Sequence, residues 1–158
     1  MEMIMKNNSI ISVTNRQSIY EDENTLEFIV MGQYFFKDDK YHIIYNEYKN
    51  KKTNELQDIC SIKVENPELV IITKIGLVES RLILEKGKRH LNYYKTEHGI
   101  INMGIYTKNI ECNMKEKSAK IRLKYCIDVN LDLLSENEVY IDVKGKDTED
   151  VEYTDNDN

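Results

Sequence analysis

The sequence predicts an all-β protein that folds as one antiparallel up-and-down meander, closed into a β-barrel of about eight to ten strands. Two observations predict this fold. Apolar residues occupy every second position along most of the chain, and short polar segments interrupt this alternation at the spacing of β-hairpins. The 3.6-residue spacing of an amphipathic helix is weak throughout.

The clearest alternation runs from residue 119 to residue 129. Six apolar positions there are separated by mostly polar ones: Ala119, Ile121, Leu123, Tyr125, Ile127 and Val129 against Lys120, Arg122, Lys124, Cys126 and Asp128. Successive side chains of a strand point to opposite faces, so this segment predicts a strand with one buried face. Similar runs, rich in β-branched and aromatic residues, cover 26–30, 41–45, 69–73, 82–84, 101–105 and 139–143.

The connections between these runs are short and polar. They lie at 21–24, 37–40, 49–54, 66–67, 86–88, 97–99, 113–117 and 132–137. Consecutive strands are therefore expected to be neighbours in space. One flat sheet of this many strands would leave two exposed edges and an uncovered apolar face, and closure into a calycin-like barrel removes both.

The length and charge distribution predict one domain with a tail. A chain of 158 residues with 41% hydrophobic and 32% charged residues is long enough for a single core. We assign residues 1–144 to the barrel. Residues 145–158 carry six acids against one lysine and few apolar residues, so we expect an acidic, disordered C-terminal tail.

The cysteines and histidines predict neither a disulfide framework nor a metal site. Cys60, Cys112 and Cys126 are widely spaced and odd in number, and the three histidines are not clustered. Known catalytic and nucleotide-binding motifs are also missing, so we predict no cofactor and assign no catalytic residue. The opening Met1–Lys6 does not resemble a signal peptide, and no apolar run is long enough for a membrane span. We expect a cytoplasmic protein with no membrane role.

Several short patterns together resemble one known family. They are Gly32-x-Tyr34, Tyr41-x-Ile43-x-Tyr45-x-Glu47, Lys74-x-Gly76, Tyr93-Tyr94-Lys95-Thr96-x-x-Gly99, Thr107 and Ile121-x-Leu123-x-Tyr125. Over about residues 9–144 the chain is similar to the YwiB-like domain-of-unknown-function family of bacterial proteins. The resemblance implies a calycin-like, lipocalin-like barrel and implies no activity. Where this chain has Lys74 we expect the family to carry Arg, so a bidentate anion contact would be lost and the charge kept.

Glu47 is the first candidate for a functional residue. It continues the face of Tyr41, Ile43 and Tyr45, and an inward carboxylate would have to pair, hydrogen-bond or take up a proton. The alternative is that the strand ends there and Glu47 lies in water at the rim. With Glu47 we group Tyr45, Lys74, Arg81 and Tyr94 as expected ligand contacts.

These residues favour a non-enzymatic barrel that binds a small or amphipathic ligand. One alternative is an enzyme that uses Glu47 as an acid/base at the barrel mouth. Another is a module that binds RNA or protein through the basic strand face of Lys120, Arg122 and Lys124. The sequence pI of about 5.2 argues against nucleic acid as the partner. The sequence predicts no oligomeric state.

Overall fold

A computed structural model describes residues 6–50 and 55–146 of the chain, and the side chains of residues 49, 50 and 56 are left out of the description. Ten strands make up this part of the protein: β1 (Ser9–Ile19), β2 (Asp22–Lys37), β3 (Lys40–Asn50), β4 (Glu55–Asn66), β5 (Leu69–Gly76), β6 (Glu79–Glu85), β7 (Arg89–Thr96), β8 (Gly99–Met114), β9 (Ser118–Val129) and β10 (Asp132–Gly145). Among these residues no helix has the length and apolar character needed to cross a membrane.

The strands form a closed barrel in simple sequence order. Each strand pairs antiparallel with the next, and β10 pairs with β1 to complete the ring. The predicted all-β, up-and-down antiparallel barrel is therefore confirmed, with the strand number at the upper end of the predicted range.

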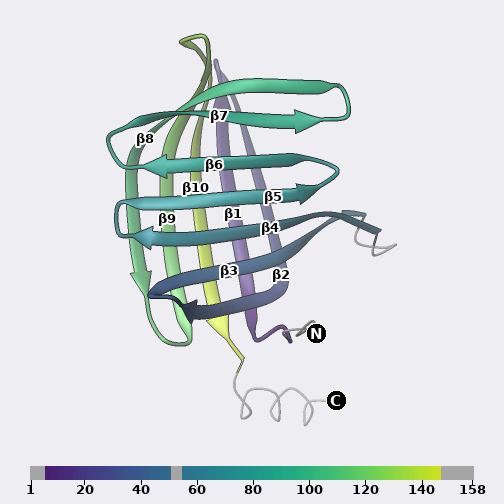
Figure 1. Cartoon of the computed structure of the whole chain (residues 1–158), viewed down its shortest axis with the longest axis vertical. Coiled ribbons are helices and arrows are strands. Elements are labelled where there is room, and N and C mark those ends of the chain that lie inside the picture. The colour runs from purple at the N-terminus through teal and green to yellow at the C-terminus, as the bar shows by residue number, and fades with distance from the viewer. Residues whose placement is uncertain (1–5, 51–54, 147–158) are drawn as a thin grey trace.

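Two groups of strands cross steeply in the barrel. In Figure 1, β3–β7 run across the view, whereas β1, β9 and β10 run along its length. β2 and β8 belong to both groups, because each pairs with a different group at its two ends. Gly104–Tyr106 of β8 pair with both β7 and β9, and a register shift follows between Thr107 and Asn109, as expected of a β-bulge at a barrel corner.

Gly32 occupies the corresponding corner of β2. It pairs with Ser9 of β1 and with Tyr45 of β3, so the two groups of strands meet at this residue. A Cβ atom on Gly32 would lie 2.3 Å from Ile11 Cδ1 and 2.6 Å from the carbonyl oxygen of Ile44. The corner therefore needs a glycine because the neighbouring strands pack directly against its Cα.

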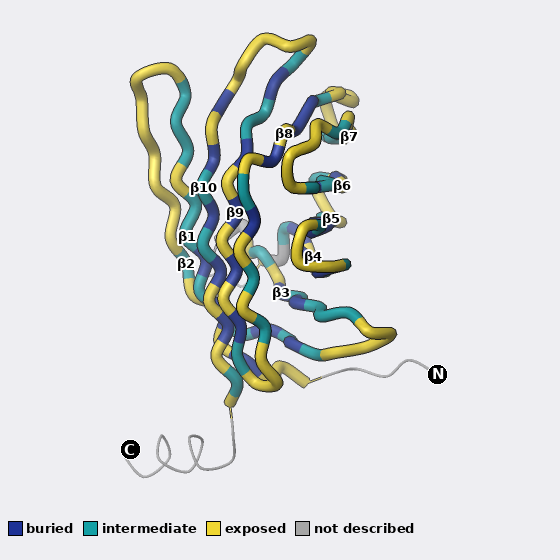
Figure 2. The backbone as a smooth tube through the Cα atoms, turned by 90° about the vertical axis from the view of Figure 1, so that its left-hand side faces the viewer, coloured by how far each residue is buried: buried dark blue, intermediate teal, exposed yellow. Residues whose placement is uncertain are grey.

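The core lies on the inner faces of the strands. Buried and exposed residues alternate along β9 and β10 in Figure 2, and Leu123 is 0% exposed whereas Lys124 is exposed. The apolar residues of the predicted 119–129 strand thus point inward. Ile43, Ile62 and Ile72 fill the interior from β3, β4 and β5.

The end of the barrel lies close to the predicted domain boundary. β10 continues to Gly145, one residue beyond the predicted limit at 144, and the backbone N–H of Lys146 donates a hydrogen bond to the carbonyl oxygen of Asn8. The predicted acidic tail falls almost entirely on residues 147–158, which lie outside the described residues.

Candidate functional site

A row of polar side chains crosses the inner face of five consecutive strands. The strand register places its members side by side, one each from β3 to β7: Tyr45, Cys60, Lys74, Ser80 and Tyr94. Directly opposed residues of neighbouring strands have Cβ atoms about 4.5–5.5 Å apart. We call these five residues the tyrosine–lysine row.

Glu47 forms an ion pair with the lysine of this row. Its Oε1 lies 3.0 Å from Lys74 Nζ, and the two side chains are 23% and 34% exposed. Glu47 shares the inner face with Tyr45 because it lies two positions further along β3. Burial works to lower the pKa of Lys74, but the charge of Glu47 and its hydrogen bond outweigh burial, so the pKa of Lys74 is raised.

Tyr45 and Cys60 lie deeper than the ion pair. Burial raises the pKa of the Cys60 thiol to about 11. Burial also raises the pKa of Tyr45, and the neighbouring Cys60 thiol adds a smaller contribution in the same direction. Burial also raises the pKa of Tyr125, on β9, to about 12, while the charge of Lys74 acts to lower it. These hydroxyl and thiol groups therefore stay protonated near neutral pH, and the side chains of Tyr45 and Cys60 are hydrogen-bonded to each other.

Asp58 is a buried carboxylate that the sequence did not reveal. It is 2% exposed and pairs directly with Glu47 in the register between β3 and β4. Its Oδ1 accepts a hydrogen bond of 2.9 Å from the backbone N–H of Val78, and its Oδ2 accepts one of 3.3 Å from Gln57 Nε2. The bond from Val78 ties the β5–β6 turn to β4, so Asp58 is part of the scaffold.

Four of the five predicted contact residues come together in the structure. Tyr45, Glu47 and Lys74 are neighbours, and Tyr94 is close enough to affect the pKa of Lys74. Arg81 lies apart from them. It pairs in register with Thr73, one position beyond the pair of Lys74 and Ser80, and is exposed on the outer face of β6. Grouping Arg81 with the other four was therefore wrong.

A groove opens beside Glu47. β2 and β3 pair only between Gly32 and Lys37 on β2 and between Lys40 and Tyr45 on β3, so residues 26–31 and 46–48 lie apart from one another. The groove has a volume of about 530 Å³. Its lining includes Leu26, Phe28 and Val30 from the inner face of β2, and Glu47. The Phe28 ring lies 5.7 Å from the Tyr45 ring, which connects the groove to the tyrosine–lysine row.

The comparisons with known proteins identify the family. The model of a family described as "Domain of unknown function (DUF1934)" matches residues 11–141. The chain belongs to the DUF1934 family. Among solved structures it is similar to the ywiB protein from Bacillus subtilis, with 20% sequence identity and a TM-score of 0.77 over 89% of this chain and 93% of the other. No curated protein matches the chain.

This DUF1934 chain does not gather its basic strand residues into one positive surface. Lys120, Arg122 and Lys124 do point outward from β9, but acids from both neighbouring strands lie between them. Arg122 Nη2 lies 2.9 Å from Glu138 Oε1, and its Nη1 lies 3.8 Å from Glu111 Oε2. This mixture of charges does not favour binding of phosphates.

The remaining candidate groups of the DUF1934 chain do not form a site. Within residues 6–50 and 55–146, no three His, Cys, Asp or Glu side chains are grouped closely enough to hold a metal ion. Burial raises the pKa of the Cys112 thiol and of the Cys126 thiol. Raised pKa values are the opposite of what a nucleophilic cysteine needs.

Proposed function

We propose that the barrel binds a small or amphipathic molecule at the groove between β2 and β3, with Glu47, Lys74, Tyr45 and Tyr94 as contacts. The ion pair of Glu47 and Lys74 inside the barrel carries this proposal. An apolar pair of the same shape is often as stabilising as a buried ion pair or more so, because the charges lose hydration. The fold alone therefore does not require charges at these positions.

The surroundings of the ion pair support the same proposal. Ligand sites combine an apolar pocket with a few polar groups that fix orientation. Here the apolar side chains of Leu26, Phe28 and Val30 border the groove, and Glu47 reaches it from β3. The hydroxyls of the tyrosine–lysine row lie beyond them.

Acid/base catalysis by Glu47 is the second candidate function. It is favoured by the position of Lys74 Nζ at hydrogen-bond distance from Glu47, since a catalytic carboxylate needs a polar partner in a pocket. The two functions differ in their outcome, because a binding barrel returns its ligand unchanged and an enzyme converts it.

Native mass spectrometry tests the proposal directly. We expect the protein purified gently from its host to carry a small molecule, and the double variant E47Q/K74M to lose it while remaining folded. The double variant is the appropriate one because it removes both charges together and leaves neither unpaired. Recovery of the same mass from the double variant would exclude this ion pair as the site. Release of a chemically altered molecule after incubation would favour the enzyme.

A further inference from the structure

β2 has a free backbone edge over most of its length. Residues 22–32 of β2 pair with β1, but β3 pairs only with residues 32–37, so residues 22–31 have a neighbouring strand on one side alone. In the part of the chain that the structure describes, no other strand pairs with this edge. Figure 2 shows this part of β2 as the exposed arm of the β1–β2 hairpin.

The alternation of backbone hydrogen bonds shows which groups point outward from this edge. The carbonyl oxygen of Gly32 accepts a hydrogen bond from the N–H of Asn8, and the N–H of Tyr34 donates to Asn8 Oδ1. Even-numbered residues of β2 therefore bond toward β1 and odd-numbered residues toward the opposite side, because the register with β1 is continuous. The N–H and C=O groups that lack a strand partner belong to Glu23, Thr25, Glu27 and Ile29.

The free edge lacks the features that usually keep sheet edges from pairing. Such edges are commonly protected by lysines, by proline or by a β-bulge. Residues 22–31 contain no Lys, Arg or Pro, and their register with β1 has no bulge. Two of their large apolar side chains are instead exposed, Leu26 by 61% on the inner face and Ile29 by 67% on the outer face. Unpaired backbone groups with apolar side chains on both faces are the features that an added strand requires.

The charges along this edge favour a basic partner. Its acids are Asp22, Glu23 and Glu27. The paired strand β1 adds one base, Arg16. Glu27 also lines the groove together with Glu47, and no Lys or Arg is among the described residues of that lining. Opposite charges directly across two strands stabilise their pairing and like charges oppose it, so a second copy of β2 would be a poor partner.

We infer that the free edge of β2 binds an extended segment of another protein as an added antiparallel strand, basic on its outer face and apolar on its inner face. Its basic side chains lie opposite Glu23 and Glu27, and its apolar side chains lie beside Leu26 and Phe28. The antiparallel direction follows that of every strand pair in the barrel. This inference goes beyond the proposed function, because it assigns a protein partner to β2 and does not require the ion pair inside the barrel.

Capped octapeptides labelled with fluorescein test the inference by fluorescence anisotropy. One peptide alternates lysine with valine, and its control alternates glutamate with valine. We expect the lysine peptide to bind the full chain at least about tenfold more tightly than the glutamate peptide, and this preference to shrink as the salt concentration rises. Equal binding of the two peptides would overturn the assignment of a basic partner.

Methylation of the peptide backbone separates strand pairing from charge attraction. Directly opposed residues of a hydrogen-bonded antiparallel pair exchange both bonds, so lysines opposite Glu23 and Glu27 point their N–H groups at β2. N-methylation of the lysine amides should therefore weaken binding at least about tenfold. N-methylation of the valine amides, which point away from β2, keeps the same charge and should have a much smaller effect. Equal effects of the two methylations would show that the peptide does not bind as an antiparallel strand.

Two variants of β2 locate the binding edge. T25P removes one outward N–H and keeps the pairing with β1, since an edge strand tolerates proline where the missing N–H faces solvent. E27K reverses one charge. Each variant should bind the lysine–valine peptide at least about tenfold more weakly. T25V and E116K are the matched controls and should bind it as the wild type does, because T25V keeps the N–H and Glu116 is exposed in the β8–β9 turn. Circular dichroism checks that each variant is folded, and wild-type affinity in folded T25P and E27K would exclude β2 as the site.

The outcomes separate this inference from the proposed function. If T25P and E27K bind the peptide normally and E47Q/K74M does not, the peptide occupies the proposed ligand site and only the inference about the edge is wrong. If the lysine–valine peptide does not bind, a basic strand is excluded, while the co-purified molecule in native mass spectrometry decides the proposed function by itself. A dimer in light scattering that T25P dissociates would assign the edge to a second copy and would also overturn the inference.

Discussion

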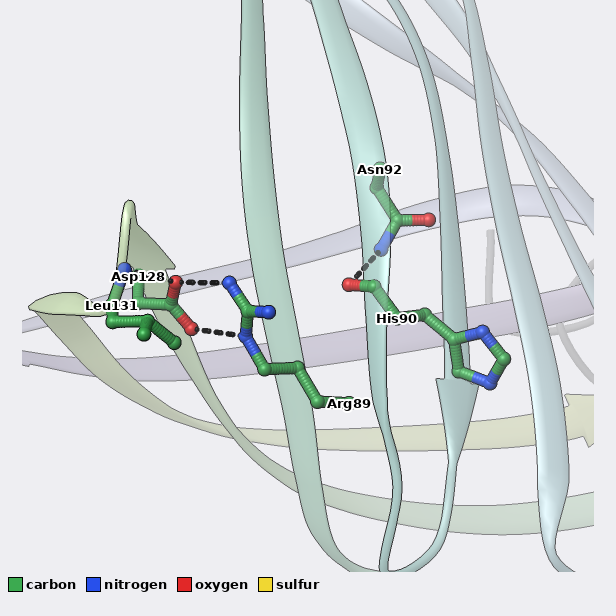
Figure 3. Close-up of polar contacts among 5 residues, drawn as sticks. All are labelled: Arg89, His90, Asn92, Asp128 and Leu131. Carbon is green, nitrogen blue, oxygen red and sulfur yellow. Dashed lines mark hydrogen bonds and ion pairs between the residues drawn. The ribbon is translucent and has the colours of Figure 1, made fainter.

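Arg89 and Asp128 join β7 to β9 through two parallel hydrogen bonds on the outer face of the barrel (Figure 3). Arg89 Nε donates to Asp128 Oδ2 at 2.9 Å and Nη2 donates to Oδ1 at 2.7 Å. The guanidinium lies over Gly104, where a Cβ would come within 2.2 Å of Nη2. Asp128 Oδ1 also accepts the backbone N–H of Leu131 at 3.1 Å, which holds the β9–β10 turn. The Asp128 carboxylate thus links β7 and β9, across β8, with the β9–β10 turn.

This pair predicts a defined dependence of stability on pH. The hydrogen bonds from Arg89 hold the pKa of Asp128 below its usual value, against the effect of burial and with help from the Leu131 N–H. A carboxyl group with a lowered folded-state pKa stabilises the fold above its unfolded-state pKa of about 3.9, and this contribution is lost as the pH falls through the folded-state value. D128N should therefore lower the urea midpoint at pH 7, and the difference from the wild type should shrink below about pH 4.

Urea unfolding between pH 2 and pH 7 measures this effect. D132N is the matched control, because Asp132 is exposed at the same β9–β10 connection. It should follow the wild type at all pH values. If the difference in urea midpoint between D128N and the wild type stays constant down to pH 2, the ion pair does not account for the stabilisation.

The burial of β9 predicts opposite effects for two adjacent substitutions. Leu123→Asp places a carboxylate at a fully buried position, and the cost of several kcal/mol is comparable to the roughly 5–15 kcal/mol that stabilises a whole domain. We expect this variant to be unfolded by circular dichroism. Lys124→Asp changes an exposed side chain and should keep the wild-type spectrum and a cooperative urea transition. Similar behaviour of the two variants would be incompatible with the inward orientation of Leu123.

The fold could be predicted from the sequence because alternation is a local property. Each strand displays its own inner and outer positions, as in 119–129, and short connections imply that consecutive strands are neighbours. The same alternation already indicates that Arg81 faces outward, which was overlooked when Arg81 was grouped with the expected ligand contacts. Leu82 and Leu84 are one face of β6, with Leu84 0% exposed, and so Arg81 between Ser80 and Leu82 must face outward.

The site could be predicted only in part because its pairs depend on register between strands. Alternation put Glu47 on the face of Tyr45, but the pairing of Lys74 with Cys60, which brings Lys74 to Glu47, depends on bulges and turn lengths in β3–β5. Asp58 was missed for a different reason: it alternates with the buried Cys60, Ile62 and Val64 on β4, but residues 55–66 were not among the predicted strands.

The burial of Cys60 predicts slow reaction with thiol reagents. Cys60 is 1% exposed and its pKa is raised to about 11, so little thiolate is present at pH 8. With iodoacetamide under native conditions we expect Cys112 and Cys126, which are half-buried, to be alkylated at least about tenfold faster than Cys60. Peptide mass mapping over time measures the three rates. Alkylation of Cys60 at the rate of Cys126 would mean that the interior beside Tyr45 is open to the reagent.

The ion pair of Glu47 and Lys74 predicts a larger coupling energy between the two side chains than an ion pair on the surface would have. E47Q leaves the Lys74 charge without its partner inside the barrel, and K74M does the same to Glu47, so each single variant should lose about 1–3 kcal/mol of unfolding free energy. The double variant E47Q/K74M removes both charges and should recover most of this loss. Urea unfolding of the four proteins gives the coupling energy from a double-mutant cycle.

The pair of Lys108 and Glu136 provides the control for this cycle. Its Nζ–Oε1 distance is also 3.0 Å, but its side chains are 44% and 53% exposed on the outer face. K108M, E136Q and their combination should give a coupling of no more than about 1 kcal/mol, because water screens exposed charges. A coupling for Glu47 and Lys74 as small as that of the surface pair would mean that water reaches both charges freely. The energetic argument for a ligand in place of a structural role would then fail, since exposed charges at the barrel mouth cost the fold nothing.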